Sequence, residues 1–350
     1  MRSYKFVSSS LAKRAVAIAL AASFAMPSFS NSLTAGPLVG STDFGLFGIS
    51  GLRGTGNGTI TVTGVTGTVT RAVLVWHGLT NTATAITRTG TIGSTNFSGT
   101  NIGLSSDNCW SQAASQAFQA DVTSAVTGNG SYVLSNMRTA GTFDPNGASL
   151  LVFYNDGNSA NNRDIAVFWG NDSNQTNSFD PAGWSASLPG INYSSGSATL
   201  SVIVSDGQNF GETGNNTLTV NSTPISFPLF QGASLPVAPG SSVAEGLWDH
   251  ASASVASVLV PGPNTLTVTG NPEGSQDCLS LVGALFDLPG GTVTPPVVPP
   301  DAVAPTVSVP TLSALGLGGV SLSAALWGIY GLRNRRRDGD TIDAEDDARQ

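Results

Sequence analysis

Apolar and polar residues alternate along most of the chain between Gly45 and Leu288, and this period of two predicts β-strands. The segment 59–63 (TITVT) alternates strictly, whereas 72–76 (AVLVW) is a continuous apolar run typical of a buried central strand. Similar runs predict strands over residues 132–134, 148–154, 165–169, 198–204, 255–260, 265–269 and 279–286. Glycine-containing turn signals separate many of them, at residues 128–130, 155–157, 205–207 and 261–263.

Residues 113–126 (AASQAFQADVTSAV) are the best candidate for a short helix, as a single amphipathic crossover between strands. Many strands with few helices favour an all-β fold, and we expect one β-sandwich of jelly-roll type over residues 31–288. The alternative is a chain of two domains that divides between about Asn177 and Gly190. The sequence shows no clear repeat, so a propeller or a solenoid is not expected.

The N-terminus has the pattern of a signal peptide. Four basic residues among the first 14 precede an uncharged run of 12 residues, which is too short to span a bilayer comfortably. Small residues place a cleavage site after Ala25 or after Ser30. We therefore expect residues 1–30 to be removed during Sec-type export, with a permanent N-terminal membrane anchor as the alternative.

The C-terminus combines a proline-rich linker (289–308), an uncharged run (312–332) and an acidic tail (338–350). As a helix, the uncharged run would be about 31 Å long and would cross one hydrocarbon core. The positive-inside rule places the arginines that follow it, and the tail, in the cytoplasm. A buried core helix is the alternative for the uncharged run.

Val309, Pro310, Thr311, Leu312 and Gly316 stand at the start of this region, and Arg333, Arg335, Arg336 and Arg337 follow the uncharged run. On these residues the region resembles the IPTL-type sorting domain of Gram-negative surface proteins over about thirty residues. The resemblance implies temporary membrane anchoring and cutting near the motif by an exosortase-like membrane transpeptidase. Two positions depart from the family pattern, because Val309 replaces isoleucine and Leu315 replaces tryptophan.

A second resemblance covers about eighty residues of the strand-rich region. The motifs at 72–76 (AVLVW), 121–123 (DVT), 128–134 (GNGSYVL) and 147–154 (GASLLVFY) are similar in order to an uncharacterised domain of bacterial surface proteins. No activity follows from that likeness. That domain often precedes repeat modules in cell-wall and adhesin-like chains.

Charge and cysteine content agree with an exported protein. Residues 31–308 contain five arginines and 16 acidic residues, a net charge of −11, which disfavours nucleic-acid binding. Cys109 and Cys278 are the only cysteines. In an oxidising compartment we expect them to form a disulfide, whose long loop would stabilise the fold by about 5 kcal/mol. Two free buried thiols are the alternative.

Candidate catalytic groups are sparse. The two histidines, His77 and His250, lack a Gly-x-Ser-x-Gly segment to present a nucleophile, and His77 ends an apolar strand. The segment EGLWDH contains Glu245 and Asp249, which on a strand would stand about 13 Å apart and so outside glycosidase spacing. We therefore expect no enzyme and no required cofactor.

Oxygen-bearing side chains crowd the segment 171–180 (NDSNQTNSFD) and make it a candidate calcium site. The segment lacks the glycine and the terminal acid of an EF-hand, so an ordinary polar turn is the alternative. The candidate ligands are Asp172, Asn174, Asn177 and Asp180.

Taken together, these patterns predict an exported structural or adhesive protein of the cell surface or extracellular matrix. The alternative is a carbohydrate-binding module or a polysaccharide-acting hydrolase at the cell surface. Such a protein would use exposed aromatic side chains, for which the candidates are Trp110, Trp169, Trp184 and Trp248.

Overall fold

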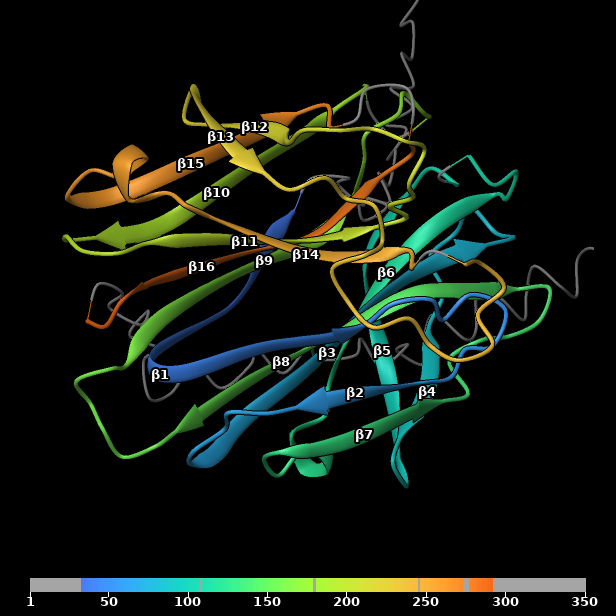
Figure 1. Cartoon of the computed structure of the whole chain (residues 1–350), viewed down its shortest axis with the longest axis horizontal. Helices are drawn as coiled ribbons and strands as arrows, with labels where there is room; N and C mark the ends of the chain where they lie inside the picture. The colour runs from blue at the N-terminus through green and yellow to red at the C-terminus, as the bar shows by residue number, and fades with distance from the viewer. Residues whose placement is uncertain (1–32, 108, 179–180, 245, 273–276, 292–350) are drawn as a thin grey trace, which may run out of the picture. The chain divides into compact units, whose positions relative to one another are not determined.

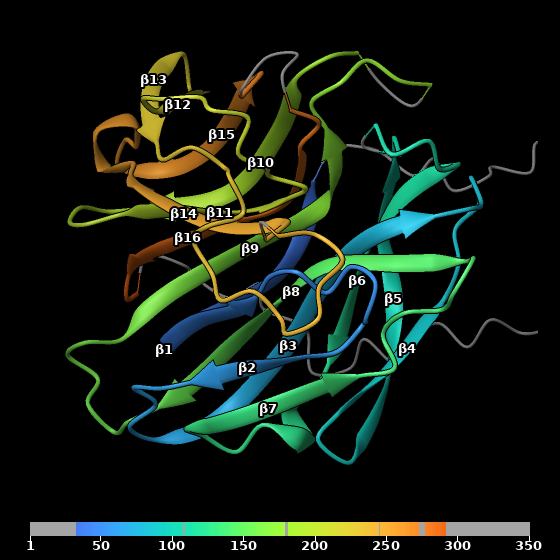
Figure 2. The same ribbon diagram turned by 45° about the vertical axis from the view of Figure 1, so that its right-hand side comes forward.

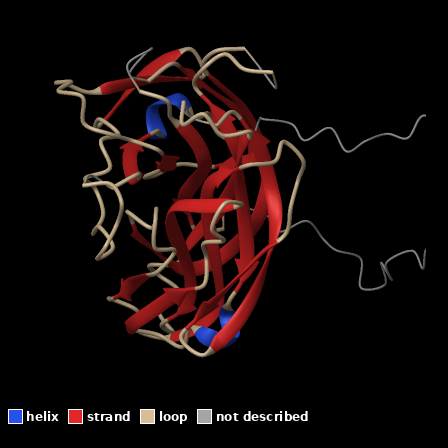
Figure 3. Ribbon diagram, turned by 90° about the vertical axis from the view of Figure 1, so that its right-hand side faces the viewer, coloured by secondary structure: helices blue, strands red, loops and turns tan. Residues whose placement is uncertain are grey.

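The computed structural model describes residues 33–291, apart from residues 108, 179–180, 245 and 273–276 (Figure 1). The all-β class predicted from the sequence is confirmed, because this part of the chain consists of antiparallel strands with two single-turn 3-10 helices (Figure 3). Those helices span Thr123–Ala125 and Ala256–Val258.

The strands divide into two consecutive sets of eight. The first set contains β1 (Thr34–Ile49), β2 (Gly58–Val62), β3 (Thr68–Thr80), β4 (Arg88–Ile92), β5 (Thr95–Ser105), β6 (Ala114–Asp121), β7 (Gly130–Ser135) and β8 (Phe143–Asn155). The second set contains β9 (Arg163–Ser173), β10 (Trp184–Tyr193), β11 (Thr199–Ser205), β12 (Asn216–Val220), β13 (Thr223–Phe227), β14 (Trp248–Ser254), β15 (Gly262–Gly270) and β16 (Ser280–Pro289).

The two sets share one strand order. In the first set, the order β1-β8-β3-β6 in one layer is completed by β5-β4-β7-β2 in another. In the second set, β9-β16-β11-β14 is completed by β10-β15-β12-β13. If β9 is numbered as the first strand of its set, the second set has the order 1-8-3-6 in one layer and 2-7-4-5 in the other. The first set has the same two orders, with the second read in the opposite direction. The protein is thus built from two equivalent eight-stranded halves, a repeat that the sequence does not reveal.

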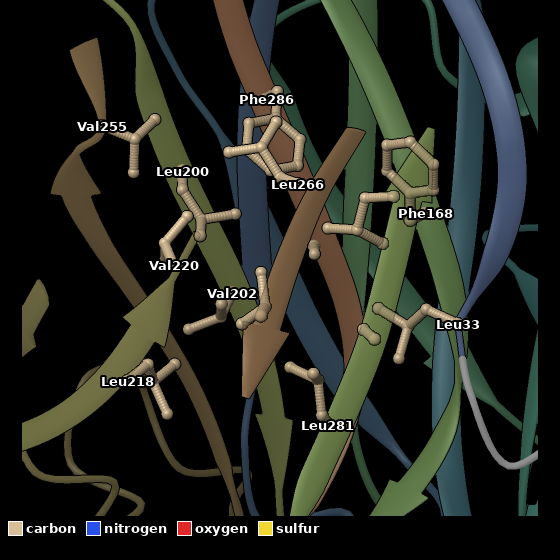
Figure 4. Close-up of a cluster of buried hydrophobic side chains, with 14 of the residues drawn as sticks. Leu33, Phe168, Leu200, Val202, Leu218, Val220, Val255, Leu266, Leu281 and Phe286 are labelled. Carbon is tan, nitrogen blue, oxygen red and sulfur yellow. The ribbon is translucent and has the colours of Figure 1, made fainter. Parts of the chain in front are cut away.

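Four layers of strands enclose three hydrophobic clusters (Figures 1 and 2). The first half closes on a cluster that includes Leu74, Phe118 and Leu150. The second half closes on another, in which side chains of β9, β11 and β16 face those of β12 and β15 (Figure 4). The third cluster lies between the halves, where β3 and β8 pack against β9 and β16.

This layering explains why some strands are apolar throughout and others alternate. In β3, Leu74 and Trp76 enter the cluster of the first half, while Val73 and Val75 enter the cluster between the halves. Successive side chains of a strand point to opposite faces, so a strand inside the stack buries both sets. The outer strand β2 buries Ile60 and Val62 and exposes Thr59 and Thr61, and hence alternates.

Strand β1 joins the halves, because it pairs with both. Its residues 34–42 pair with β9, and its residues 43–49 pair with β8. The register shifts between Val39 and Thr42, where Ser41 has a left-handed φ of 51° and donates its N–H to Asp164 Oδ1 at 2.8 Å. This irregularity bends the strand and lets one sheet continue from the first half into the second.

The halves approach so closely that glycine is required at the contact. A Cβ on Gly147 would lie 2.4 Å from Trp248 Cβ, and one on Gly103 would lie 2.4 Å from the backbone nitrogen of Asn171. Gly147 and Gly103 belong to the first half, whereas Trp248 and Asn171 belong to the second. The absence of side chains at these glycines lets the two sheets stack.

Two local predictions were wrong. Residues 113–126 form no α-helix, because Ala114–Asp121 is strand β6, which pairs with β3 and β5 and buries both of its faces. Tertiary pairing overrides the weak helical period there. Residues 255–260 contain a 3-10 turn, not a strand, since the chain turns after β14 to reach β15.

The single sandwich expected from the sequence is instead two stacked sandwiches. The change from one half to the other falls in the β8–β9 loop (156–162), about twenty residues before the division that the sequence suggested. Contacts nevertheless group the described residues into one compact unit. A polar, turn-rich loop within a domain and a linker between domains have similar composition, which is why the sequence pattern does not separate them.

The expected signal peptide (1–30), most of the linker and the whole sorting segment lie outside the described residues. Pro289, taken as the first residue of the linker, is the last residue of β16. The described residues contain no helix with the length and apolar character needed to cross a bilayer.

Candidate functional site

The predicted disulfide between Cys109 and Cys278 is confirmed, with the two Cα atoms 6.1 Å apart. Cys109 lies in the β5–β6 loop of the first half, and Cys278 lies just before β16 of the second. The bond therefore ties together the two halves at one edge of the stacked sheets. The two cysteines are 169 residues apart in sequence.

The loop that carries Cys109 is held in a defined shape. The Asp107 carboxylate accepts the backbone N–H groups of Cys109 at 3.1 Å and Gln112 at 2.9 Å. Cys109 and Ser111 both have left-handed φ angles, 64° and 59°. Glycine, which has no Cβ, adopts such angles more easily than cysteine or serine. The disulfide and Asp107 together therefore impose this conformation. Trp110 lies between these two strained residues.

Beneath Trp110, a buried ion pair crosses between the halves. Arg53, from the β1–β2 loop, places Nη2 at 2.9 Å from Asp206 Oδ1, just after β11. Both side chains are almost fully buried, 6% and 1% exposed. Asn146 connects them, because its Oδ1 accepts from Arg53 and its Nδ2 donates to Asp206 Oδ1 at 3.1 Å.

Trp110 covers this pair. Its Nε1–H donates to Asp206 Oδ2 at 2.6 Å, and its ring lies 3.8 Å from Arg53 Cζ in a cation–π contact. Burial raises the pKa of Asp206 to about 6, although Arg53 and these hydrogen bonds act to lower it. The disulfide loop, the ion pair and Trp110 thus form one connected assembly across the two halves.

A pocket of about 290 Å³ opens beside this assembly. Its floor and walls come from the β1–β2 loop, the disulfide loop and the segment before and at the start of β8. It combines aromatic, apolar, basic and acidic groups, and Asp144 is its only carboxylate among the described residues. The lining residues are Arg53, Leu79, Trp110, Gln112, Arg138, Gly141, Thr142, Phe143 and Asp144.

Among the four tryptophans proposed as ligand platforms, only Trp110 reaches this pocket. Trp184 and Trp248 are fully enclosed in the hydrophobic clusters, and Trp169 is 8% exposed. Trp110 is partly exposed and lines the pocket. Burial decides between these tryptophans, and the strand pattern of the sequence gives no measure of it.

The two histidines are hydrogen-bonded to serines inside the stack. His77 Nδ1 lies 2.7 Å from Ser205 Oγ, and His250 Nε2 lies 2.7 Å from Ser149 Oγ. Ser149 Oγ also accepts the indole N–H of Trp248 at 2.8 Å. Each pair joins a strand of the first half to a strand of the second, and neither histidine lines the pocket described above.

These buried histidines predict a loss of stability in acid. Burial, assisted by the charge of Arg53, lowers the pKa of His77 to about 3, and burial lowers that of His250 to about 4, from 6.5. Below pH 6.5 the unfolded chain takes up protons that the folded chain does not, so stability present above pH 6.5 is lost as the pH falls. From pH 7 to pH 5 each histidine removes about 2 kcal/mol.

Two buried carboxyl groups oppose that loss. Burial raises the pKa values of Asp206 and Asp249, so the folded chain binds these protons first and gains stability as the pH falls. For Asp206 this gain develops as the pH falls through about 6. We expect a net decrease of about 2 kcal/mol in unfolding free energy between pH 7 and pH 5, measured by urea denaturation. His250→Gln should at least halve it. An unchanged or higher stability at pH 5 would contradict this account.

The candidate calcium ligands use their polar atoms within the fold. Asp172 Oδ2 accepts the N–H of Ser185 at 2.9 Å. Asn174 is fully buried. Its Nδ2 donates to the carbonyl oxygens of Pro272 and Asp277, and its Oδ1 accepts the N–H of Leu279. Asn177 donates to the Gln175 carbonyl at 2.8 Å, and Asp180 lies outside the described residues.

No group of three or more acidic, histidine or cysteine side chains in the described part is placed to hold a metal ion. A calcium site in this segment remains a sequence prediction. In the segment EGLWDH, Glu245 lies outside the described residues, and Asp249 is buried and accepts the N–H groups of Gly232 and Ser234.

Sequence reasoning missed four residues of the assembly and its pocket: Arg53, Asp144, Asn146 and Asp206. In the sequence, Asp206 stands out only as part of a turn signal. One signal was available, since arginine is rare in the strand-rich region and each one there is unusual. Their convergence depends on loops more than 90 residues apart, which no local pattern encodes.

Comparison with models of known protein families, with curated proteins and with solved structures found no match to this chain.

Proposed function

We propose that this chain is an exported, non-catalytic protein of the cell surface or extracellular matrix with a structural or adhesive role. The observation that carries this proposal is the Cys109–Cys278 disulfide between the two halves. Disulfides persist in oxidising compartments and are rare in the cytosol. A bond that also orders the loop around Trp110 is suited to a protein that works outside the cell.

The ends of the chain support the same destination. The basic and apolar N-terminal pattern suits Sec-type export, and the segment from Val309 to Arg337 suits transient membrane anchoring and recognition by an exosortase-like sorting enzyme. In this proposal the proline-rich linker separates the strand-rich region from the membrane during sorting.

We further propose that each half is a jelly roll. An eight-stranded double sheet with the shared order described above is the arrangement expected of that fold. Stacked in this way, the pair gives a rigid body in which the strands at the centre are buried on both faces. Rigidity of this kind suits a structural or adhesive module.

The proposal predicts where the protein is found and how its ends are processed. In a Gram-negative host with an exosortase-like system, we expect the mature protein in the outer-surface or medium fraction, starting after Ala25 or Ser30 and ending near Pro310. Mass spectrometry of the intact, non-reduced protein measures both ends. Material retained in the cytoplasm with Met1 and Gln350 would contradict export, and an exported chain ending at Gln350 would contradict sorting.

A second candidate function is carbohydrate binding at the cell surface. The pocket beside Trp110 favours it, because an aromatic ring, a carboxylate and amide or guanidinium donors line one small concave site. A hydrolase is favoured less, since glycosidases need two carboxyl groups across the scissile bond and the second nearby carboxyl, Asp206, is buried beneath Trp110.

A further inference from the structure

The pocket beside Trp110 contains polar groups that the fold leaves unused. Arg53 is almost fully buried, and its Nη1 has no hydrogen-bond partner among the described residues, although Nε and Nη2 are both bonded. Buried guanidinium nitrogens are rarely left unpaired, because losing hydration without a hydrogen bond is costly. The unpaired nitrogen belongs to a residue that lines the pocket.

Arg138, at the pocket rim, adds further donors. Its Nε lies 3.2 Å from Asp144 Oδ1, and its side chain is 34% exposed. Within the described part, no hydrogen bond is made by its Nη1 and Nη2 nitrogens or by the side-chain amide of Gln112. These groups are available to a ligand and could form the paired hydrogen bonds that arginine makes with a carboxylate.

Arginines are also concentrated here in a chain that is otherwise acidic. Five arginines lie between residues 33 and 291, and three of them surround this pocket. Arg53 and Arg138 line it, and Arg88 lies 4.9 Å from the ring centroid of the wall residue Phe143. Basic side chains gathered in one hollow raise the local concentration of anions.

The pocket suits more than a bare anion. Asp144 Oδ1 accepts the N–H of Gly54 at 2.8 Å, while its Oδ2 has no hydrogen bond in the described part and can accept from a hydroxyl group. Trp110, which is partly exposed, provides aromatic surface for the apolar face of a ring. A volume of about 290 Å³ is at the small end of ligand sites, which suits one or two sugar rings.

We propose that this pocket binds a uronic acid unit of an acidic polysaccharide. The carboxylate is held by Arg138 and Arg53 Nη1, a hydroxyl donates to Asp144 Oδ2, and the ring packs on Trp110. This inference deepens the carbohydrate-binding candidate and rests on it. An acidic peptide would supply the carboxylate but would leave the Asp144 acceptor unused.

The test is to titrate the full-length, disulfide-intact protein with galacturonic acid. Binding is measured by calorimetry and by the NMR chemical shift of the Trp110 indole N–H. Galactose is the matched neutral sugar, and acetate is the matched carboxylate without a ring. We expect galacturonic acid to shift the Trp110 resonance and to bind at least about tenfold more tightly than either. Arg138→Gln should weaken binding by about tenfold or more, since one charge-assisted pair is lost.

Arg71→Gln is the matched control, because Arg71 lies on β3 near Asp121 and does not line the pocket. It removes the same charge and should leave affinity within about twofold of the unmodified protein. Equal weakening by Arg71→Gln would overturn the assigned site. Arg138→Lys keeps the charge without the planar fork, and intermediate affinity would support paired recognition.

Other outcomes decide the ligand class. Galactose binding as tightly as galacturonic acid would keep a sugar site and overturn the acidic preference. Acetate or a short aspartate-rich peptide binding as tightly would overturn the sugar. No binding of any probe would overturn both carbohydrate proposals and would leave the export result unchanged, because export is measured by the location and ends of the mature protein.

Discussion

Replacing both Cys109 and Cys278 by serine should lower the free energy of unfolding by about 4–5 kcal/mol. The disulfide joins residues 169 positions apart, and the chain-entropy account gives the largest stabilisation to such long loops. We expect the loss to appear in urea denaturation at pH 7 followed by tryptophan fluorescence. We also expect the Trp110 indole N–H to lose the shift that its bond to Asp206 produces, because the loop is no longer held.

The control for this result is reduction of the unmodified protein. Reduced wild type should unfold within about 1 kcal/mol of the serine variant, and the serine variant should not respond to the reductant. If the serine variant unfolds with a free energy less than about 1 kcal/mol below that of the disulfide-bonded wild type, non-covalent contacts alone hold the two halves together.

Replacing Arg53 by methionine should cost about 3–5 kcal/mol at pH 7. The substitution leaves Asp206 buried with a negative charge and no cation, and removing one partner of a buried ion pair is strongly destabilising. At pH 5 the cost should be smaller, because burial already raises the pKa of Asp206 to about 6 and loss of Arg53 raises it further. Urea denaturation at both pH values measures the difference.

The chain offers a matched control in Arg163→Met. Arg163 forms an ion pair with Asp287 near the surface, where both side chains are partly exposed, 26% and 38%. Solvent screens such pairs, so this substitution should cost no more than about 1 kcal/mol. Removing both buried charges with Arg53→Met and Asp206→Leu should cost less than Arg53→Met alone. Equal costs for Arg53→Met and Arg163→Met would show that burial adds nothing to the pair.

Both predictions concern the same place in the molecule. The disulfide, the Arg53–Asp206 pair and Trp110 all link the β5–β6 loop and the β1–β2 loop of the first half to the second half. Their combined effect is to fix the geometry of the adjoining pocket. If the proposed ligand site is built on this junction, we expect its affinity to fall when Cys109 and Cys278 are reduced, because the position of Trp110 is then less fixed.

The sequence by itself determined the all-β class, the disulfide and the positions of several strands, among them β3, β8, β9 and β16, but not those of β1, β5 and β10. Alternation at 59–63 and unbroken apolar runs at 72–76 and 150–154 follow directly from burial on one face or on two. The cysteine pair followed from counting, since only one intramolecular bond was possible. These features are local or combinatorial, and side-chain chemistry fixes them without knowledge of the partners.

Only the tertiary structure decided the number of sandwiches, the strand identity of residues 114–121 and the candidate site. The unbroken runs do not say which sheet covers each face, so one sandwich and two predict nearly the same pattern. β6 is a strand because β3 and β5 supply its hydrogen bonds, and that pairing overrides its helical period. Arg53, Asp206 and Trp110 meet because the packing of the two halves brings together loops that are far apart in the chain, and such long-range contacts leave no mark in a short window of sequence.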